Sequence, residues 1–96
     1  MGFIQIIDVR TSKYDELMAF DAEWRSATEG KRTLRRSLVT RDRNDPEHYL
    51  ILAFFDDYES AMTNSQLPET GEFAAKQMAI ADGPATFLDL DVLVDE

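Results

Sequence analysis

The sequence of 96 residues has no cysteine, one histidine, three prolines and four glycines. Without cysteine it forms neither a disulfide framework nor a thiolate zinc site. It also lacks the roughly 20 consecutive apolar residues that a membrane-spanning helix needs, since its longest apolar run is Leu50–Phe55. No basic-then-apolar leader is visible at the N-terminus. These absences predict a cytoplasmic protein with no membrane partner.

Basic side chains are almost missing from the second half of the chain. The 10 basic and 19 acidic residues give a net charge of −9. Residues 1–43 carry nine basic and seven acidic side chains, whereas residues 44–96 carry one and twelve. Such an acidic chain repels phosphate backbones, which disfavours a nucleic-acid partner. With 44% hydrophobic and 30% charged residues, the composition is that of a folded globule, and the length predicts a single domain over residues 1–96.

Apolar periodicity predicts the first three elements. Branched residues predict a strand over 3–10. An apolar stripe at helical spacing, which ends at Trp24, predicts a helix over 13–28 that begins with a capping box at Ser12. Strict alternation over 32–42 predicts a second strand.

The next segment predicts a hairpin and then a broken helix. Turn residues 44–46 separate the second strand from a third, over His48–Phe55. A capping box at Asp56 predicts the start of a helical region. Leu67 and Pro68 interrupt that region, because proline is tolerated at the first turn of a new helix. The second helix therefore has two parts.

Alternation over 86–94 predicts a fourth strand and completes the order β-α-β-β-α-β. Two split βαβ units with right-handed crossovers give a four-stranded antiparallel sheet in the order 4-1-3-2, with the helices on one face. This is the ferredoxin-like fold of the α+β class.

The first and third strands are apolar on both faces, although the helices cover only one. An exposed apolar face of this kind predicts an interaction surface. A homodimer that packs face to face as an α/β barrel is the favoured interpretation, and a different protein partner is the alternative. Charge separation on the two edge strands suggests that the basic second strand of one subunit meets the acidic fourth strand of the other. The residues concerned are Arg32, Arg35, Arg36, Arg41 and Arg43 on one side and Asp89, Asp91, Asp95 and Glu96 on the other.

The element order, the length, the two-sided sheet and the aromatic-rich first helix resemble the dimeric α/β-barrel proteins, and among them the antibiotic biosynthesis monooxygenase (ABM) family. The segment 58–70, in which an aromatic-led capping turn leads into a kinked helix, is similar to the second-helix region of that family. The resemblance implies a pocket between the sheet and its own helices. It also implies activities seen among family members: cofactor-free oxygenation of aromatic polyketides, in which the substrate itself activates oxygen, or haem degradation. Haem-degrading members take an iron ligand from a second-helix histidine, and the single histidine here, His48, lies elsewhere, so no haem or other cofactor is expected.

Three residues are candidates for catalysis. The resemblance implies that Asn64, Trp24, Tyr58 and Arg36 are counterparts of the polar and aromatic pocket residues of the oxygenases, by residue type and approximate position. Asn64 either caps the break at Leu67 or directs its amide into the pocket, and Trp24 is either core or pocket wall. His48 has an ordinary pKa that suits a general base, although a surface histidine paired with Glu47 is favoured.

Tyr58, Arg36 and Phe73 are candidates for substrate binding. Tyr58 and Phe73 fall on inward helix faces and are mainly core residues in this interpretation. Arg36 would anchor an anionic substrate if it pointed inward, but a role at the dimer interface or in solvent is favoured. No metal is expected, because one histidine and no cysteine leave only scattered carboxylates.

These observations predict a cofactor-independent monooxygenase-like protein that acts on a small aromatic or hydrophobic molecule. The alternative is a non-catalytic binding or structural dimer. Isomerase or decarboxylase chemistry would need His48 or a carboxylate inside the pocket. An enzyme of this kind should have a cavity of roughly 300 Å³ or more, lined by Trp24, Asn64 and Tyr58.

Overall fold

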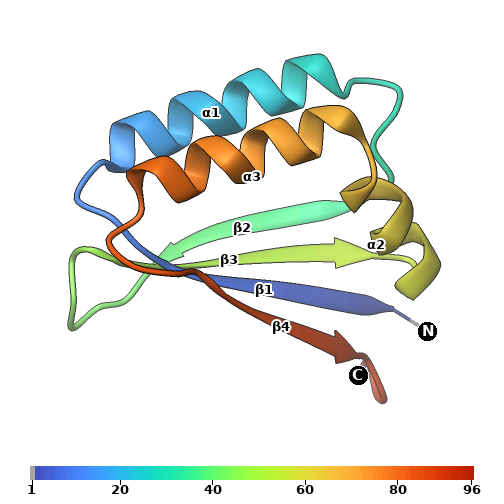
Figure 1. Cartoon of the computed structure of the whole chain (residues 1–96). Coiled ribbons are helices and arrows are strands. Elements are labelled where there is room, and N and C mark those ends of the chain that lie inside the picture. Colours follow the sequence, from blue (N-terminus) through green and yellow to red (C-terminus); the bar gives the residue numbers. More distant parts are fainter. Residues whose placement is uncertain (1) are drawn as a thin grey trace.

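The computed structural model describes residues 2–96 and confirms the predicted order of elements. The second helix is split into two, as the sequence predicts (Figure 1). The elements are β1 (Phe3–Arg10), α1 (Tyr14–Ala27), β2 (Arg36–Arg41), β3 (His48–Phe55), α2 (Tyr58–Ser65), α3 (Pro68–Ile80) and β4 (Thr86–Asp91).

The four strands form one antiparallel sheet in the order β2-β3-β1-β4, which is the predicted order. In the centre of the sheet Ile7 of β1 lies opposite Ile51 of β3 and Phe87 of β4. Helices α1 and α3 run side by side over one face of the sheet, and α2 lies at the end where β3 finishes (Figure 1). This arrangement is the ferredoxin-like fold.

The core lies between the sheet and the helices. Its main cluster comprises Val9, Leu17, Tyr49, Ile51 and Ile80, all of them buried. A smaller cluster forms where α2 meets the ends of β1 and β3. The burial of apolar area is the main source of folding free energy. It holds the helices against the sheet, and this packing fixes the side chains that lie between the helices and the sheet.

The break in the second helix is built from Leu67 and Pro68. Leu67 is extended, with φ −64° and ψ 135°, and its N–H donates to the backbone oxygen of Asn64 at 3.3 Å. Pro68 then takes the first helical position, where its missing N–H costs no intrahelical hydrogen bond. The break therefore follows directly from the local sequence.

Both predicted capping boxes differ from the structure. The side chain of Asp57, not Asp56, caps α2 by accepting from the N–H of Ser60 at 2.7 Å. At α1 no side chain caps the helix, so the prediction for Ser12 is wrong. Buried Thr11 is used instead, because its hydroxyl donates to the backbone oxygen of Ile80 at 2.7 Å and so joins the start of α1 to the end of α3.

The edge strands are shorter than predicted. β2 begins at Arg36 rather than at residue 32, and β4 ends at Asp91 rather than at residue 94. One further backbone contact follows the end of β4, because the N–H of Val92 donates to the oxygen of Gly2 at 2.9 Å. The side chain of Leu93 beyond it is 80% exposed.

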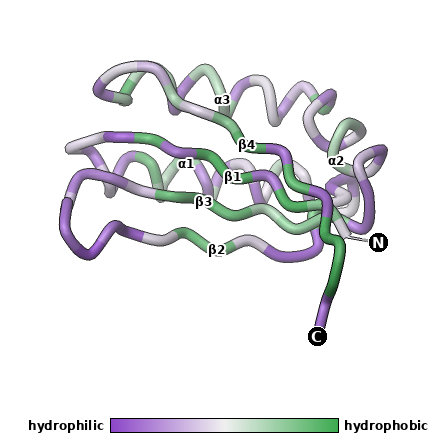
Figure 2. The backbone as a smooth tube through the Cα atoms, turned by 90° about the horizontal axis from the view of Figure 1, so that it is seen from below, coloured by the Kyte–Doolittle hydropathy of each residue, from purple (hydrophilic) through white to green (hydrophobic). Residues whose placement is uncertain are grey.

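The second face of the sheet carries no helix and is called here the open face (Figure 2). In Figure 2, which views this face, hydrophobic stretches run along the strands and meet in the middle of the sheet. Leu38 and Leu88 on the two edge strands are 36% and 50% exposed. By strand alternation from the buried positions, the apolar residues of the open face are Ile4, Ile6, Leu38, Leu50, Leu52, Phe54, Leu88 and Leu90.

None of the helices within residues 2–96 is long and apolar enough to cross a membrane.

Candidate functional site

A cavity of about 90 Å³ lies between the helices and the sheet, and is called here the sheet–helix pocket. Every layer of the fold contributes to its wall. Apolar side chains predominate, with a few polar groups among them, which is the usual composition of a small-molecule site. The lining residues are Gln5, Ile7, Asp21, Trp24, Leu34, Ser37, Ile51, Ala53, Phe55, Asn64, Thr70 and Phe73.

Trp24 forms one wall and is held on three sides. Its indole N–H donates to the hydroxyl of Thr70 at 2.9 Å, which ties α1 to α3. Phe73 lies against the ring with 6.4 Å between centroids. The guanidinium of Arg32 lies 5.9 Å from the ring centroid. Trp24 is 8% exposed, so it is both a core residue and a pocket wall, and the two predicted roles coincide.

Asn64 lies in the last turn of α2 and is 6% exposed. Its backbone oxygen, not its side chain, accepts hydrogen bonds at the helix break. The side-chain oxygen Oδ1 is buried and has no hydrogen-bond partner within residues 2–96. A buried carbonyl without a partner costs about 1–3 kcal/mol. Of the two predicted roles, the geometry therefore favours an amide that lies against the pocket.

Four polar lining residues, Gln5, Asp21, Ser37 and Thr70, were not among the predicted candidates. Asp21 from α1 and Ser37 from β2 are joined by Arg25, whose Nε donates to Asp21 at 3.0 Å and whose Nη2 donates to Ser37 at 2.6 Å. Arg25 thereby bridges the helix and the edge strand at the border of the cavity. Asp21 could have been found from the sequence, because it lies three residues before Trp24 and so shares its helix face.

Tyr58 does not line the pocket, and the prediction that it points inward is wrong. It is 54% exposed and packs edge-on against Phe3, with 5.5 Å between ring centroids. The reason is its position: it is the first residue of α2, at the outer end of the sheet. Phe73 does line the pocket, as predicted. The cavity of about 90 Å³ is also smaller than the 300 Å³ expected of an enzyme.

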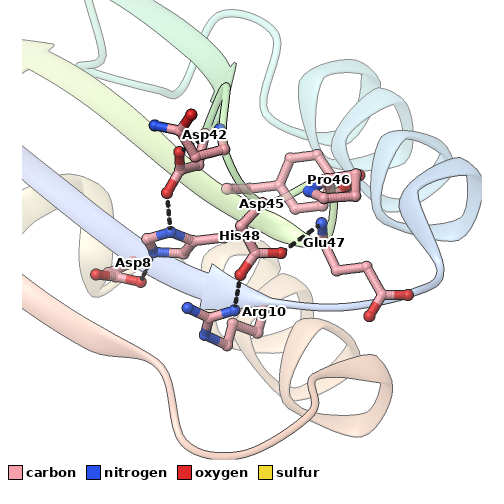
Figure 3. Close-up of polar contacts among 9 residues, drawn as sticks. Asp8, Arg10, Asp42, Asp45, Pro46, Glu47 and His48 are labelled. Atoms are coloured by element: carbon pink, nitrogen blue, oxygen red, sulfur yellow. Dashed lines mark hydrogen bonds and ion pairs between the residues drawn. The ribbon is translucent and has the colours of Figure 1, made fainter.

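Arg36 and His48 lie on the open face, on the opposite side of the sheet from the pocket. Arg36 pairs with Phe54 in the register and its guanidinium lies 5.6 Å from that ring. His48 is the first residue of β3, next to the turn that joins β2 to β3 (Figure 3). Neither side chain is among those that line the sheet–helix pocket.

His48 is held between two carboxylates, and the predicted pairing with Glu47 is wrong (Figure 3). Nδ1 lies 3.0 Å from Asp42 Oδ2, and Nε2 lies 2.7 Å from Asp8 Oδ1. The ring can donate to both only when it is doubly protonated. These hydrogen bonds, Asp42 first and Asp8 second, raise the pKa of His48. In its protonated form His48 thus clamps two strands and the β2–β3 turn together, and both ring nitrogens are engaged by carboxylates.

Further hydrogen bonds stabilise the same turn. Asp45 accepts from Arg10 and from the N–H of Glu47, and these contacts lower the pKa of Asp45. Asp42 accepts from the N–H of Asn44, the main reason that its pKa is lowered. Within residues 2–96 no three histidine or acidic side chains are placed to hold a metal ion.

Three of the arginines predicted to face a partner are engaged within the chain. Arg32 donates to the backbone oxygen of Arg25 at 2.7 Å and lies over Trp24. Arg35 contacts Asp56 through Nε and Nη2, the shorter distance being 2.6 Å. Arg41 lies on the helix-covered side, over the rings of Tyr14 and Tyr49. Arg36, by contrast, lies on the open face and has no ion pair with any residue in 2–96.

The fold is that of the antibiotic biosynthesis monooxygenase proteins of known structure, so the resemblance seen in the sequence holds for the architecture. The chain is similar to SnoaB, a cofactor-independent oxygenase from Streptomyces nogalater, with a TM-score of 0.81 and 12% identity over 98% of this chain and 95% of that one. It is similar to a candidate antibiotic biosynthesis monooxygenase from Nitrosomonas europaea, with a TM-score of 0.80 and 8% identity over 96% and 90% of the two chains. It is also similar to Rv0793 from Mycobacterium tuberculosis, with a TM-score of 0.80 and 10% identity over 99% and 98%. No protein-family model and no curated protein matches the sequence. At these identities the similarity establishes the fold.

Proposed function

We propose that this protein is a cofactor-independent oxygenase that acts on a small aromatic molecule in the sheet–helix pocket. The observation that carries the proposal is the unpartnered Oδ1 of Asn64, buried beside the apolar lining of that pocket. A ligand with a phenolic hydroxyl would supply the missing donor, and Trp24 would lie against its ring. The similarity to SnoaB, a cofactor-independent oxygenase, supports the same chemistry.

The residues of the pocket suit a reaction in which the substrate provides the electrons. An electron-rich phenol can reduce dioxygen itself and become a quinone: the reacting ring carbon exchanges its C–H bond for a C=O bond to one oxygen atom. The other oxygen atom leaves as water with the hydrogens of that C–H and of the phenolic O–H. Asn64 would hold the phenolic oxygen through its hydrogen bond, and the apolar walls would keep bulk water away from the reacting carbon. Trp24 would keep the ring in one orientation, because Thr70 fixes the indole.

The pocket must enlarge to take such a ligand. Its volume of about 90 Å³ suffices for several water molecules but is below the roughly 300 Å³ of a typical ligand site. Leu34 and Phe73 are half-buried and can change rotamer. The contact of Arg25 with Ser37 is solvent-exposed, and exposed polar contacts of this kind contribute little stability. We therefore place ligand entry between α1 and β2.

The test is oxygen uptake with a panel of quinols and naphthalene diols. We expect at least one to be consumed with dioxygen, and Asn64→Ala and Trp24→Phe to lower the rate. Asn44→Ala is the matched control, because Asn44 lies in the exposed β2–β3 turn. Rates that are equal in all three variants would remove Asn64 and Trp24 from the mechanism.

The same panel separates an enzyme from a binding protein. Trp24 is the one tryptophan of the chain, so a ligand that enters the pocket changes its fluorescence directly. Saturable quenching without oxygen uptake would favour the non-catalytic alternative. Quenching that persists unchanged in Asn64→Ala would place the ligand away from the amide.

Asp21 favours a second candidate function, proton transfer as in an isomerase. Proton transfer of this kind requires an acid–base group at the pocket, and the carboxylate of Asp21 lines it. Arg25 holds that carboxylate in place. Exchange of substrate C–H protons with deuterated water, followed by NMR, is the test. Exchange that is lost in Asp21→Asn and kept in Asn64→Ala would select this function over oxygenation.

We further propose that the open face forms the interface of a homodimer. The apolar side chains along all four strands support this, because a monomer would leave them in water. Leu52, which lies between Ile6 and Leu38 in the register, is at the centre. Leu52→Asp should yield monomers in light scattering, whereas Ala75→Asp on the exposed side of α3 should not. An unchanged mass for Leu52→Asp would contradict the proposal.

A further inference from the structure

A second hollow lies at the other end of α1 from the sheet–helix pocket. Its volume is about 500 Å³, within the roughly 300–1,000 Å³ of small-molecule sites. Tyr14 of α1, Arg41 of β2 and Tyr49 of β3 line it, and they also line an adjoining hollow of about 170 Å³. Tyr49 belongs to the core beneath the helices. The hollow is therefore on the helix-covered side, and a dimer closed over the open face leaves it accessible.

Arg41 is held in one place within this hollow. Its guanidinium carbon lies 5.2 Å from the ring centroid of Tyr14 and 5.3 Å from that of Tyr49. Its Nη2 donates to the hydroxyl of Tyr49 at 3.2 Å, and that hydroxyl donates to the backbone oxygen of Pro46 at 3.1 Å. The two rings are stacked, with 5.3 Å between centroids, and Tyr49 is 2% exposed. The half-buried ring of Tyr14 and the buried ring of Tyr49 thus orient the cation before any ligand arrives.

The same guanidinium has no carboxylate partner. No ion pair joins Arg41 to an acidic residue within 2–96. This is notable because Asp15, Glu16 and Glu47 line the same hollow. The side chain stacks on the tyrosines instead, which leaves part of its planar fork of N–H donors free. A guanidinium fork matches the two oxygens of a carboxylate.

We propose that this hollow binds a small organic carboxylate, whose oxygens accept hydrogen bonds from Arg41. Lys13 also lines the hollow and adds positive charge. The three carboxylates on the rim oppose multiply charged anions, so a monocarboxylate or an amino-acid zwitterion suits the site better than a phosphate. The proposal is independent of the oxygenase function, since the hollow shares no lining residue with the sheet–helix pocket.

The first test uses benzoate as the probe and benzylamine as its oppositely charged match. Each is titrated into the ¹⁵N-labelled full chain and followed in two-dimensional ¹H–¹⁵N NMR spectra. Benzoate should shift the amide signals of residues 11–16 and 47–49, and leave that of Asn64 unchanged. Phenylalanine should act in the same way. Equal shifts from benzylamine, or none from benzoate and phenylalanine, would overturn the proposal.

Three variants then identify the residue responsible. Arg41→Gln should weaken benzoate binding at least about tenfold, the size expected when a hydrogen bond to a charged group is lost. Glu47→Gln should strengthen it, because a repelling charge is removed. Arg43→Gln is the matched control, since Arg43 is a neighbouring arginine that does not line the hollow. Unchanged affinity in Arg41→Gln, or weaker affinity in the turn variant Glu47→Gln, would refute the assignment.

Discussion

Replacing Asn64 with leucine should make the protein more stable while it removes ligand binding. If Asn64 had a purely structural role, its side-chain amide would have hydrogen-bond partners within the protein, and replacing it would destabilise the fold. Here Oδ1 is buried without a partner. Leucine has the same branched skeleton of four heavy atoms, although its methyl groups are bulkier, and it carries no polar atom and favours helix. The expected sign is therefore opposite for a functional and for a structural asparagine.

The magnitude follows from the cost of the unpartnered oxygen. That cost is about 1–3 kcal/mol, and part of it is offset because leucine fits the amide site imperfectly. We expect a gain of about 1.5 kcal/mol in the free energy of unfolding. For a chain of 96 residues the entropy of unfolding is about 0.2 kcal/mol per degree, so the melting temperature should rise by about 7 °C.

The assay is urea unfolding followed by far-UV circular dichroism, at one fixed protein concentration because a dimer couples stability to concentration. Thr63→Leu, one residue earlier on the exposed side of α2, controls for helix propensity. Ligand binding is read in parallel from the fluorescence of Trp24. A loss of more than about 1 kcal/mol in Asn64→Leu, with an unchanged Thr63→Leu, would refute the idea that the amide is kept for a ligand.

Three further predictions concern the frame around the pocket. Leu17→Ala should lower the free energy of unfolding by about 3 kcal/mol in urea titrations, because the side chain is fully buried in the main core cluster. Thr70→Val should cost about 1–2 kcal/mol by the same measurement, because the indole N–H of Trp24 loses its acceptor; an equal loss in the Trp24→Phe background would contradict this. The free energy of unfolding should fall as the pH rises from about 6 through the raised pKa of His48. The reason is that the folded protein binds this proton more tightly than the unfolded chain does, and loses that advantage when His48 is deprotonated. In His48→Gln this pH dependence of the free energy of unfolding should be absent.

The fold was predictable because its signals are local. Runs of branched and apolar residues defined β1 and β3, alternation defined β2 and β4, and the sequence Leu67–Pro68 defined the break between α2 and α3. The strand order then followed from the handedness of the crossovers. The ends of elements were less predictable, because they depend on contacts distant in sequence. Thr11 is the clearest example, since its partner Ile80 lies 69 residues away.

The site was only partly predictable, for a similar reason. Trp24 and Asn64 were found because one ends an apolar stripe and the other precedes a helix break. Ser37 becomes a neighbour of the cavity only when α1 lies over β2, and Arg25 connects it to Asp21 only then. Alternation along a strand identifies the residues that share a face but not which face is covered. The placement of Arg36 on the open face could therefore not be decided from sequence.

The interruption at Leu67 makes the roof of the sheet–helix pocket a two-piece structure. Asn64 belongs to the piece before the interruption, and Thr70 and Phe73 belong to the piece after it. A residue inserted at this joint would move one piece relative to the other while every strand kept its register. The pocket can thus be reshaped by changes in one short connection, which makes that joint the natural place to vary when ligands of a different size are to be accommodated.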